Sequence, residues 1–153
     1  MTKKFLLEQL KRAEFCALDE IRFHEKYDDQ HYWLNHEKGH LEIIELVQNW
    51  ISYSKDIDIR KIKKLIRSRV KFNQDTIHQI EEKNNNWEND EEGFNNFEKT
   101  DDGFLYHLSD GMNCEAGILI RILNKKYYYP KSVYIPTNWD EFMKKGKQSV
   151  VNE

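Results

Sequence analysis

Residues 32–53 read YWLNHEKGHLEIIELVQNWISY, and this stretch decides the fold because it is the most apolar segment with helical spacing. On a helix, one face carries two histidines among apolar side chains: Trp33, His36, His40, Ile44, Val47 and Ile51. That face should pack against the rest of the domain. We therefore expect both histidines to lie in or beside the core.

Composition favours one folded domain over residues 1–153. The chain is 39% hydrophobic and 33% charged, a balance that supports an ordinary core under a heavily charged surface. The N-terminus lacks the features of a signal peptide, and no apolar run is long enough to span a membrane. Two cysteines, Cys16 and Cys114, do not make a disulfide framework. We expect a soluble cytoplasmic protein.

Helical spacing extends to both sides of this stretch. It predicts helices over residues 3–27, 32–53 and 57–83, joined by short connections, and hence an N-terminal antiparallel bundle over residues 1–83. The next segment, 84–102, is rich in acids and asparagine and lacks a clear period. We interpret it as an acidic loop or a short surface helix.

The last part of the chain, residues 103–145, has the pattern of a small antiparallel sheet. Strands are predicted over 103–109, 117–123 and 127–135, with a turn at Asp110-Gly111 and a short helix over 138–145. The second strand is apolar on almost both faces, and we place it at the centre. The expected fold class is therefore α+β, with a helical bundle followed by a three-stranded sheet and a C-terminal helix.

The string His36-Glu37-Lys38-Gly39-His40 matches the HExxH pattern. Histidines at i and i+4 point the same way from a helix and can hold one zinc ion, with the intervening glutamate as general base. On these five residues the chain resembles zinc metallopeptidases. The resemblance implies zinc on His36 and His40, with Glu37 as the catalytic base.

The chain departs from those enzymes around the string. Lys38 and Glu42 place charges where their longer pattern has uncharged residues, and no third ligand follows at the usual spacing. The preceding segment is also helical, where those enzymes have a strand. We therefore expect the histidines to be structural, with no cofactor and no catalytic residue, and keep a zinc-dependent hydrolase as the alternative.

Charge is unevenly distributed, although the net charge is only -3. Residues 60–71 hold seven basic side chains and no acid, whereas residues 81–102 hold nine acids and two lysines. The acidic segment also carries aromatic side chains. Acidic side chains can steer a basic partner toward this segment, and aromatic side chains can anchor it. The residues expected to form this partner-binding surface are Trp87, Glu88, Asp90, Glu91, Glu92, Phe94 and Phe97.

We accordingly expect a small protein-binding inhibitor that docks this acidic aromatic surface on a basic protein. Immunity proteins, antitoxins and blockers of nucleic-acid enzymes share this charge pattern, and a nuclease would be a suitable partner. The aromatic side chains could instead pack back onto the bundle. Besides the zinc hydrolase, a third alternative is nucleic-acid binding through the basic helix at residues 59–71.

Overall fold

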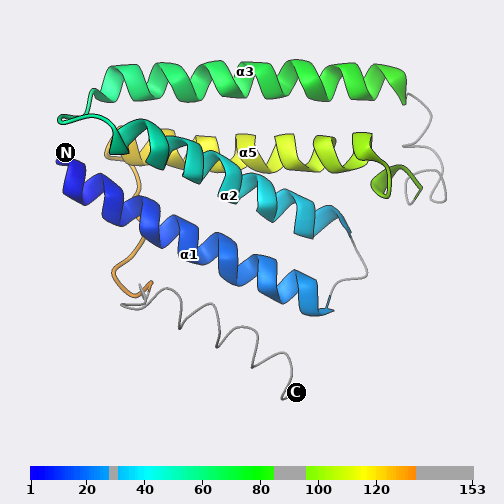
Figure 1. The fold of residues 1–153 in the computed structure, drawn as a ribbon, viewed down its shortest axis with the longest axis horizontal. Coiled ribbons are helices and arrows are strands. Elements are labelled where there is room, and N and C mark those ends of the chain that lie inside the picture. Colours follow the sequence, from blue (N-terminus) through cyan, green and yellow to red (C-terminus); the bar gives the residue numbers. More distant parts are fainter. Residues whose placement is uncertain (28–30, 85–95, 134–153) are drawn as a thin grey trace.

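The computed structural model describes residues 1–27, 31–84 and 96–133, and these residues form helices without any strand. Four long helices make up the fold (Figure 1): α1 (Lys3–Tyr27), α2 (His31–Ser52), α3 (Ile59–Lys83) and α5 (Asp101–Leu123). Residues 96–98 form a helical turn just before α5. No helix among the described residues is both long enough and apolar enough to cross a membrane.

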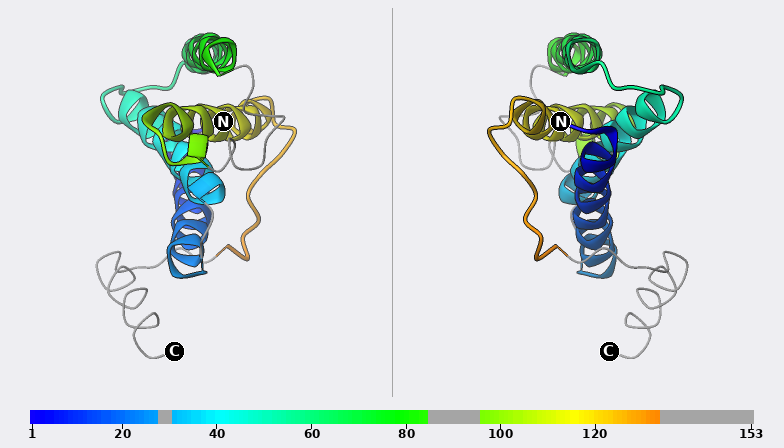
Figure 2. Two further views of the ribbon diagram at one scale, coloured as in Figure 1. Left: turned by 90° about the vertical axis from the view of Figure 1, so that its right-hand side faces the viewer. Right: turned by 90° about the vertical axis from the view of Figure 1, so that its left-hand side faces the viewer.

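The helices stack in an order that differs from the order of the chain. α1 packs on α2, α2 packs on α5, and α5 packs on α3, so that α3 lies on the outside (Figures 1 and 2). α2 and α5 run in the same direction, while α1 and α3 run the opposite way. The core lies at these contacts and is made of Leu6, Leu10, Ala13, Ala17, Ile43, Ile44, Val47, Ile51, Ile62, Ile66, Met112, Ala116, Leu119, Ile122 and Leu123.

The helices predicted over 3–27, 32–53 and 57–83 are confirmed within two residues at each end. The carboxylate of Asp58 accepts a hydrogen bond from the Lys61 backbone N–H and caps the start of α3. The apolar face expected on α2 is buried as predicted at Ile44, Val47 and Ile51. Trp33 is the exception, because 46% of it is exposed.

The predicted α+β fold is wrong, because the segment assigned to two strands and a turn is the single helix α5. Thr100 caps this helix by accepting a hydrogen bond from the Gly103 N–H, and Asp101 and Asp102 sit favourably in its first turn. α5 lies between α2 and α3 and is therefore apolar on two sides. A helix buried in this way has the same nearly continuous apolar pattern as a central strand.

The third predicted strand is also wrong over its described part, residues 127–133, which have no regular structure. This segment turns back from α5 and is fixed by Tyr129. The Tyr129 N–H donates to the Gln9 side chain of α1 over 2.7 Å. Residues 134–135 and the predicted helix at 138–145 lie outside the described residues, as do residues 85–95 of the acidic segment.

Candidate metal centre between α2 and α5

Two glycines bring the backbones of α2 and α5 very close together. A Cβ atom on Gly39 would overlap the carbonyl oxygen of Leu108, and one on Gly111 would overlap the carbonyl oxygen of His36. Only glycine permits such an approach, because any other residue would force the helices apart. The close contact brings side chains of one helix within reach of polar side chains on the other.

The two helices face each other with matching pairs of side chains. α2 presents His36 and His40 at i and i+4, and α5 presents Asp110 and Cys114 at the same spacing. Residues at this spacing lie on one face of a helix. Because α2 and α5 run in the same direction, one pair is brought alongside the other.

His36 lies at the centre of the resulting cluster and contacts both α5 side chains. Its Nε2 atom lies 3.3 Å from an Asp110 carboxylate oxygen and 3.5 Å from the Cys114 sulfur. His36 is 8% exposed, whereas Asp110 and Cys114 are more open to solvent. The ring stacks on Tyr32, with centroids 5.9 Å apart. One side of the cluster is therefore accessible from water while its histidine is held in the protein.

Ionisation in this cluster follows from these contacts. The hydrogen bond from His36 holds the pKa of Asp110 below its ordinary value, because it stabilises the carboxylate. Burial raises the pKa of the Cys114 thiol, and the negative charge of Asp110 raises it further. The thiol is therefore protonated at neutral pH unless a cation replaces its proton.

The other histidine, His40, is held by a buried carboxylate. Its Nδ1 atom lies 2.8 Å from Glu115, which is only 2% exposed. The Tyr129 hydroxyl donates to the same carboxylate over 2.9 Å. Although burial opposes the charged imidazolium, the hydrogen bond to Glu115 and its charge raise the pKa of His40. With Nδ1 occupied, the remaining Nε2 is the atom that could serve as a ligand.

Glu37 forms a second group with the two histidines of α2. One of its carboxylate oxygens lies within 4.8 Å of ligand atoms on both His36 and His40. Burial raises the pKa of Glu37 by disfavouring the charged carboxylate, while the nearby imidazoles act in the opposite direction. A partly buried carboxylate with a raised pKa is suited to accept a proton from a bound water.

The distances around His36 can be compared with those of a tetrahedral zinc site. Zinc bonds of about 2.1 Å to nitrogen or oxygen and about 2.3 Å to sulfur place ligand atoms about 3.4 Å (N to O) and about 3.6 Å (N to S) apart. The separations in the structure, 3.3 Å and 3.5 Å, agree with both values. His36, Asp110 and Cys114 are all within 4.8 Å of one another and could hold one ion. Three protein ligands leave a fourth position open to solvent.

A third histidine, His107, lies next to the cluster and is almost fully buried. It is 1% exposed, and neither ring nitrogen has a hydrogen-bond partner among the described atoms. The nearest carboxylate oxygen, on Glu98, is 3.6 Å away. Burial lowers the pKa of His107 to about 4, so the ring is neutral at physiological pH.

The zinc alternative from the sequence named the α2 half of this cluster, His36, Glu37 and His40, although the favoured interpretation was that the histidines are structural. It missed Asp110, Cys114, Glu115 and His107 on α5. The missed signal was the i, i+4 spacing of Asp110 and Cys114, which is meaningful only on a helix. With Asp110-Gly111 interpreted as a turn between two strands, the spacing of Asp110 and Cys114 has no significance.

The acidic aromatic surface stays a prediction. Of its seven residues only Phe97 is described, and it is 4% exposed, with its ring against Tyr106 and His107. The other six, Trp87, Glu88, Asp90, Glu91, Glu92 and Phe94, lie outside the described residues. The basic helix at residues 59–71 forms the first half of α3, on the outside of the fold.

No protein family, curated protein or solved structure matches the chain.

Proposed function

We propose that the protein is a zinc-dependent hydrolase whose metal is bound by His36, Asp110 and Cys114. The observation that carries this proposal is the pair of distances from His36 Nε2 to the Asp110 oxygen and the Cys114 sulfur, 3.3 Å and 3.5 Å. The donor set of nitrogen, oxygen and sulfur suits zinc, because zinc accepts all three atom types in tetrahedral sites.

The environment of the three ligands supports a reactive site rather than a closed structural one. A structural zinc site is usually closed by four protein ligands, whereas the described part of the chain brings three close together in this cluster. The side chain of Asp110 is 42% exposed and Cys114 is also exposed, so water and a small substrate can reach the fourth position.

We assign the action on that water to Glu37, whose carboxylate lies within 4.8 Å of ligand atoms on His36 and His40. Zinc makes a nearby water more acidic, and Glu37 would accept its proton. The water oxygen would then bond to the carbonyl carbon of an ester or amide, and the leaving group would depart with the proton that Glu37 returns. His40, fixed by Glu115, lies on the same side of α2 and can donate a hydrogen bond to the oxygen that gains charge.

Zinc titration of untagged protein against a chromophoric chelator tests the binding step. We expect one zinc per chain, with an affinity at least tenfold lower in His36→Ala and in Cys114→Ser. Two matched controls change the same residue types elsewhere: Cys16→Ser on α1, and His78→Ala, whose side chain is 70% exposed on α3. Equal zinc affinity in His36→Ala and the wild type would refute the site.

Glu37→Gln separates binding from catalysis. If Glu37 is the base, this variant binds zinc with the wild-type affinity but loses at least a hundredfold in the hydrolysis of activated esters such as nitrophenyl acetate. A Glu37→Gln protein that hydrolyses these esters at the wild-type, zinc-dependent rate would exclude that role.

A further inference from the structure

The outer face of α3 carries a stripe of four basic side chains, Arg60, Lys64, Arg67 and Lys71, which we call the basic stripe. Their spacing of four, three and four residues places them on one face of the helix, opposite the buried side chains of Ile62, Ile66 and Asn73. All four are exposed. The stripe extends over about 16 Å at 1.5 Å per residue.

Within residues 1–27, 31–84 and 96–133, none of these four side chains forms an ion pair. At the far end of α3, by contrast, Lys83 pairs with Asp102 over 3.1 Å.

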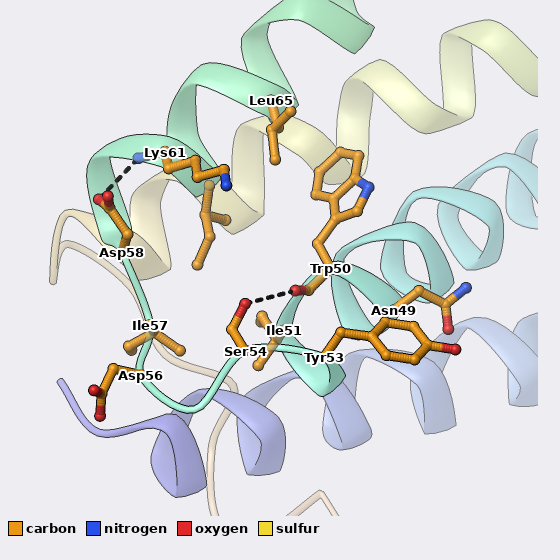
Figure 3. A pocket seen from close by; sticks show the side chains of 11 residues that line it. Asn49, Trp50, Ile51, Tyr53, Ser54, Asp56, Ile57, Asp58, Lys61 and Leu65 are labelled. Carbon is orange, nitrogen blue, oxygen red and sulfur yellow. Dashed lines mark hydrogen bonds between the residues drawn. The ribbon is translucent and has the colours of Figure 1, made fainter.

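A cavity of about 500 Å³ lies at the connection between α2 and α3, on the side of α3 that carries Lys61, Ile62 and Leu65. Figure 3 shows Trp50 beside Leu65 of α3, with Tyr53 and Asn49 together on the α2 side. Tyr53 is 92% exposed. Lys61 also lines the cavity and is the next residue after Arg60 of the stripe.

The chemistry of this cavity suits a nucleobase better than a phosphate. Indole and phenol rings offer flat apolar surfaces on which bases stack, and Asn49 can form hydrogen bonds to a base edge. Asp56 and Asp58 also line the cavity and would repel a phosphate there. The stripe has the opposite character, because its four cations attract phosphates and no acid stands between them.

A second exposed aromatic residue lies farther along α3. Phe72 is 57% exposed, and the Arg69 guanidinium lies 4.9 Å from the centre of its ring. It occurs seven residues after Leu65 and so lies on the side of α3 that lines the cavity. Cations flanked by exposed aromatic rings are typical of surfaces that bind single-stranded nucleic acid.

From this arrangement we infer that α3 binds single-stranded nucleic acid, with phosphates along the basic stripe and bases on Tyr53, Trp50 and Phe72. This activity does not depend on the proposed zinc site, which lies between α2 and α5. It can therefore be measured in the presence of a chelator.

The test is fluorescence anisotropy with a labelled fifteen-nucleotide oligothymidylate and the full chain, at several salt concentrations in the presence of EDTA. We expect saturable binding that weakens with salt, with a slope of log affinity against log salt of about -3 for four phosphate contacts. Lys64→Ala with Arg67→Ala should weaken binding at least tenfold at low salt and reduce the slope to about half. Tyr53→Ala and Phe72→Ala should each weaken binding about fivefold or more, with the slope unchanged.

The matched control is Lys4→Ala with Lys126→Ala, which removes the same charge from exposed positions outside α3. It should bind within twofold of the wild type. The inference is overturned if the oligonucleotide shows no saturable binding at low salt, or if the control loses as much affinity as the stripe variant. It is also overturned if vesicles containing anionic lipid bind the protein and the oligonucleotide does not compete with them.

Discussion

The Nε2 atom of His36 lies 3.5 Å from the Sγ atom of Cys114, although 78 positions separate the two residues in the chain. They meet because α2 and α5 run in the same direction and touch at Gly39 and Gly111. The candidate site thus depends on two glycines, Gly39 and Gly111, which have no side chain to bind a ligand themselves.

Gly39→Ala should therefore destabilise the protein strongly. The added methyl group would overlap the backbone of Leu108 and Met112, which cannot move away as a flexible side chain could. We expect a loss of about 3 kcal/mol in the free energy of unfolding, measured by urea denaturation.

Gly117→Ala on α5 is the matched control, because its methyl group would meet nothing within 4 Å. That variant should be as stable as the wild type or up to about 1 kcal/mol more stable. Equal stability of the two variants would contradict the close approach of α2 and α5.

Tyr129→Phe should weaken the attachment of the segment after α5. The lost hydroxyl donates to Glu115, a buried carboxylate that also holds His40. Leaving this acceptor without one of its partners should lower the free energy of unfolding by about 1–3 kcal/mol. The neighbouring Tyr128→Phe serves as control, because Tyr128 is 42% exposed and packs edge-on against Phe5. A loss of stability in Tyr128→Phe equal to that in Tyr129→Phe would count against the hydrogen bond.

His107 should make the protein less stable in mild acid. Its pKa is about 4 in the folded protein, whereas an unfolded chain binds this proton at about pH 6.5. The neutral ring therefore costs no stability above about pH 6.5, and stability falls as the pH decreases from about 6.5 to about 4. The complete loss corresponds to about 3 kcal/mol. His40 acts in the opposite direction, because its raised pKa gives stability that is lost as the pH rises.

Urea denaturation at a series of pH values, with a chelator present, isolates this contribution. The difference in unfolding free energy between the wild type and His107→Gln should change by about 3 kcal/mol between pH 7 and pH 4. The matched control is His78→Gln, at an exposed position on α3, which should not reproduce this change. If the His107→Gln difference does not vary with pH, the buried ring is not neutral as described.

The first three helices could be predicted from the sequence because each has one apolar face with helical spacing. α5 could not be predicted in this way, because the residues that it buries against α2 and α3 include glycines and polar side chains such as His107 and Glu115, which obscure the helical period. Its glycines also resembled turn markers. Gly111 is in fact the point where α5 meets α2, and Gly103 closely approaches the backbone at Phe97.

The incorrect assignment of the α5 segment to strands also limited how much of the candidate site could be predicted from the sequence. His36, Glu37 and His40 lie within five consecutive residues and form a recognisable string. Asp110 and Cys114 acquire a meaning only when the segment is helical and faces α2, which is information about packing. Local sequence patterns do not contain it.

Cobalt(II) substitution is the most direct test of the proposed metal centre, because a cobalt–thiolate bond gives an intense charge-transfer absorption in the near ultraviolet. We expect this absorption in the wild type and in Cys16→Ser, with saturation at one cobalt per chain. We expect no such absorption in Cys114→Ser, and a weaker apparent affinity in His36→Ala. A charge-transfer band that persists in Cys114→Ser, or that never forms in the wild-type protein under reducing conditions, would contradict a metal centre on His36, Asp110 and Cys114.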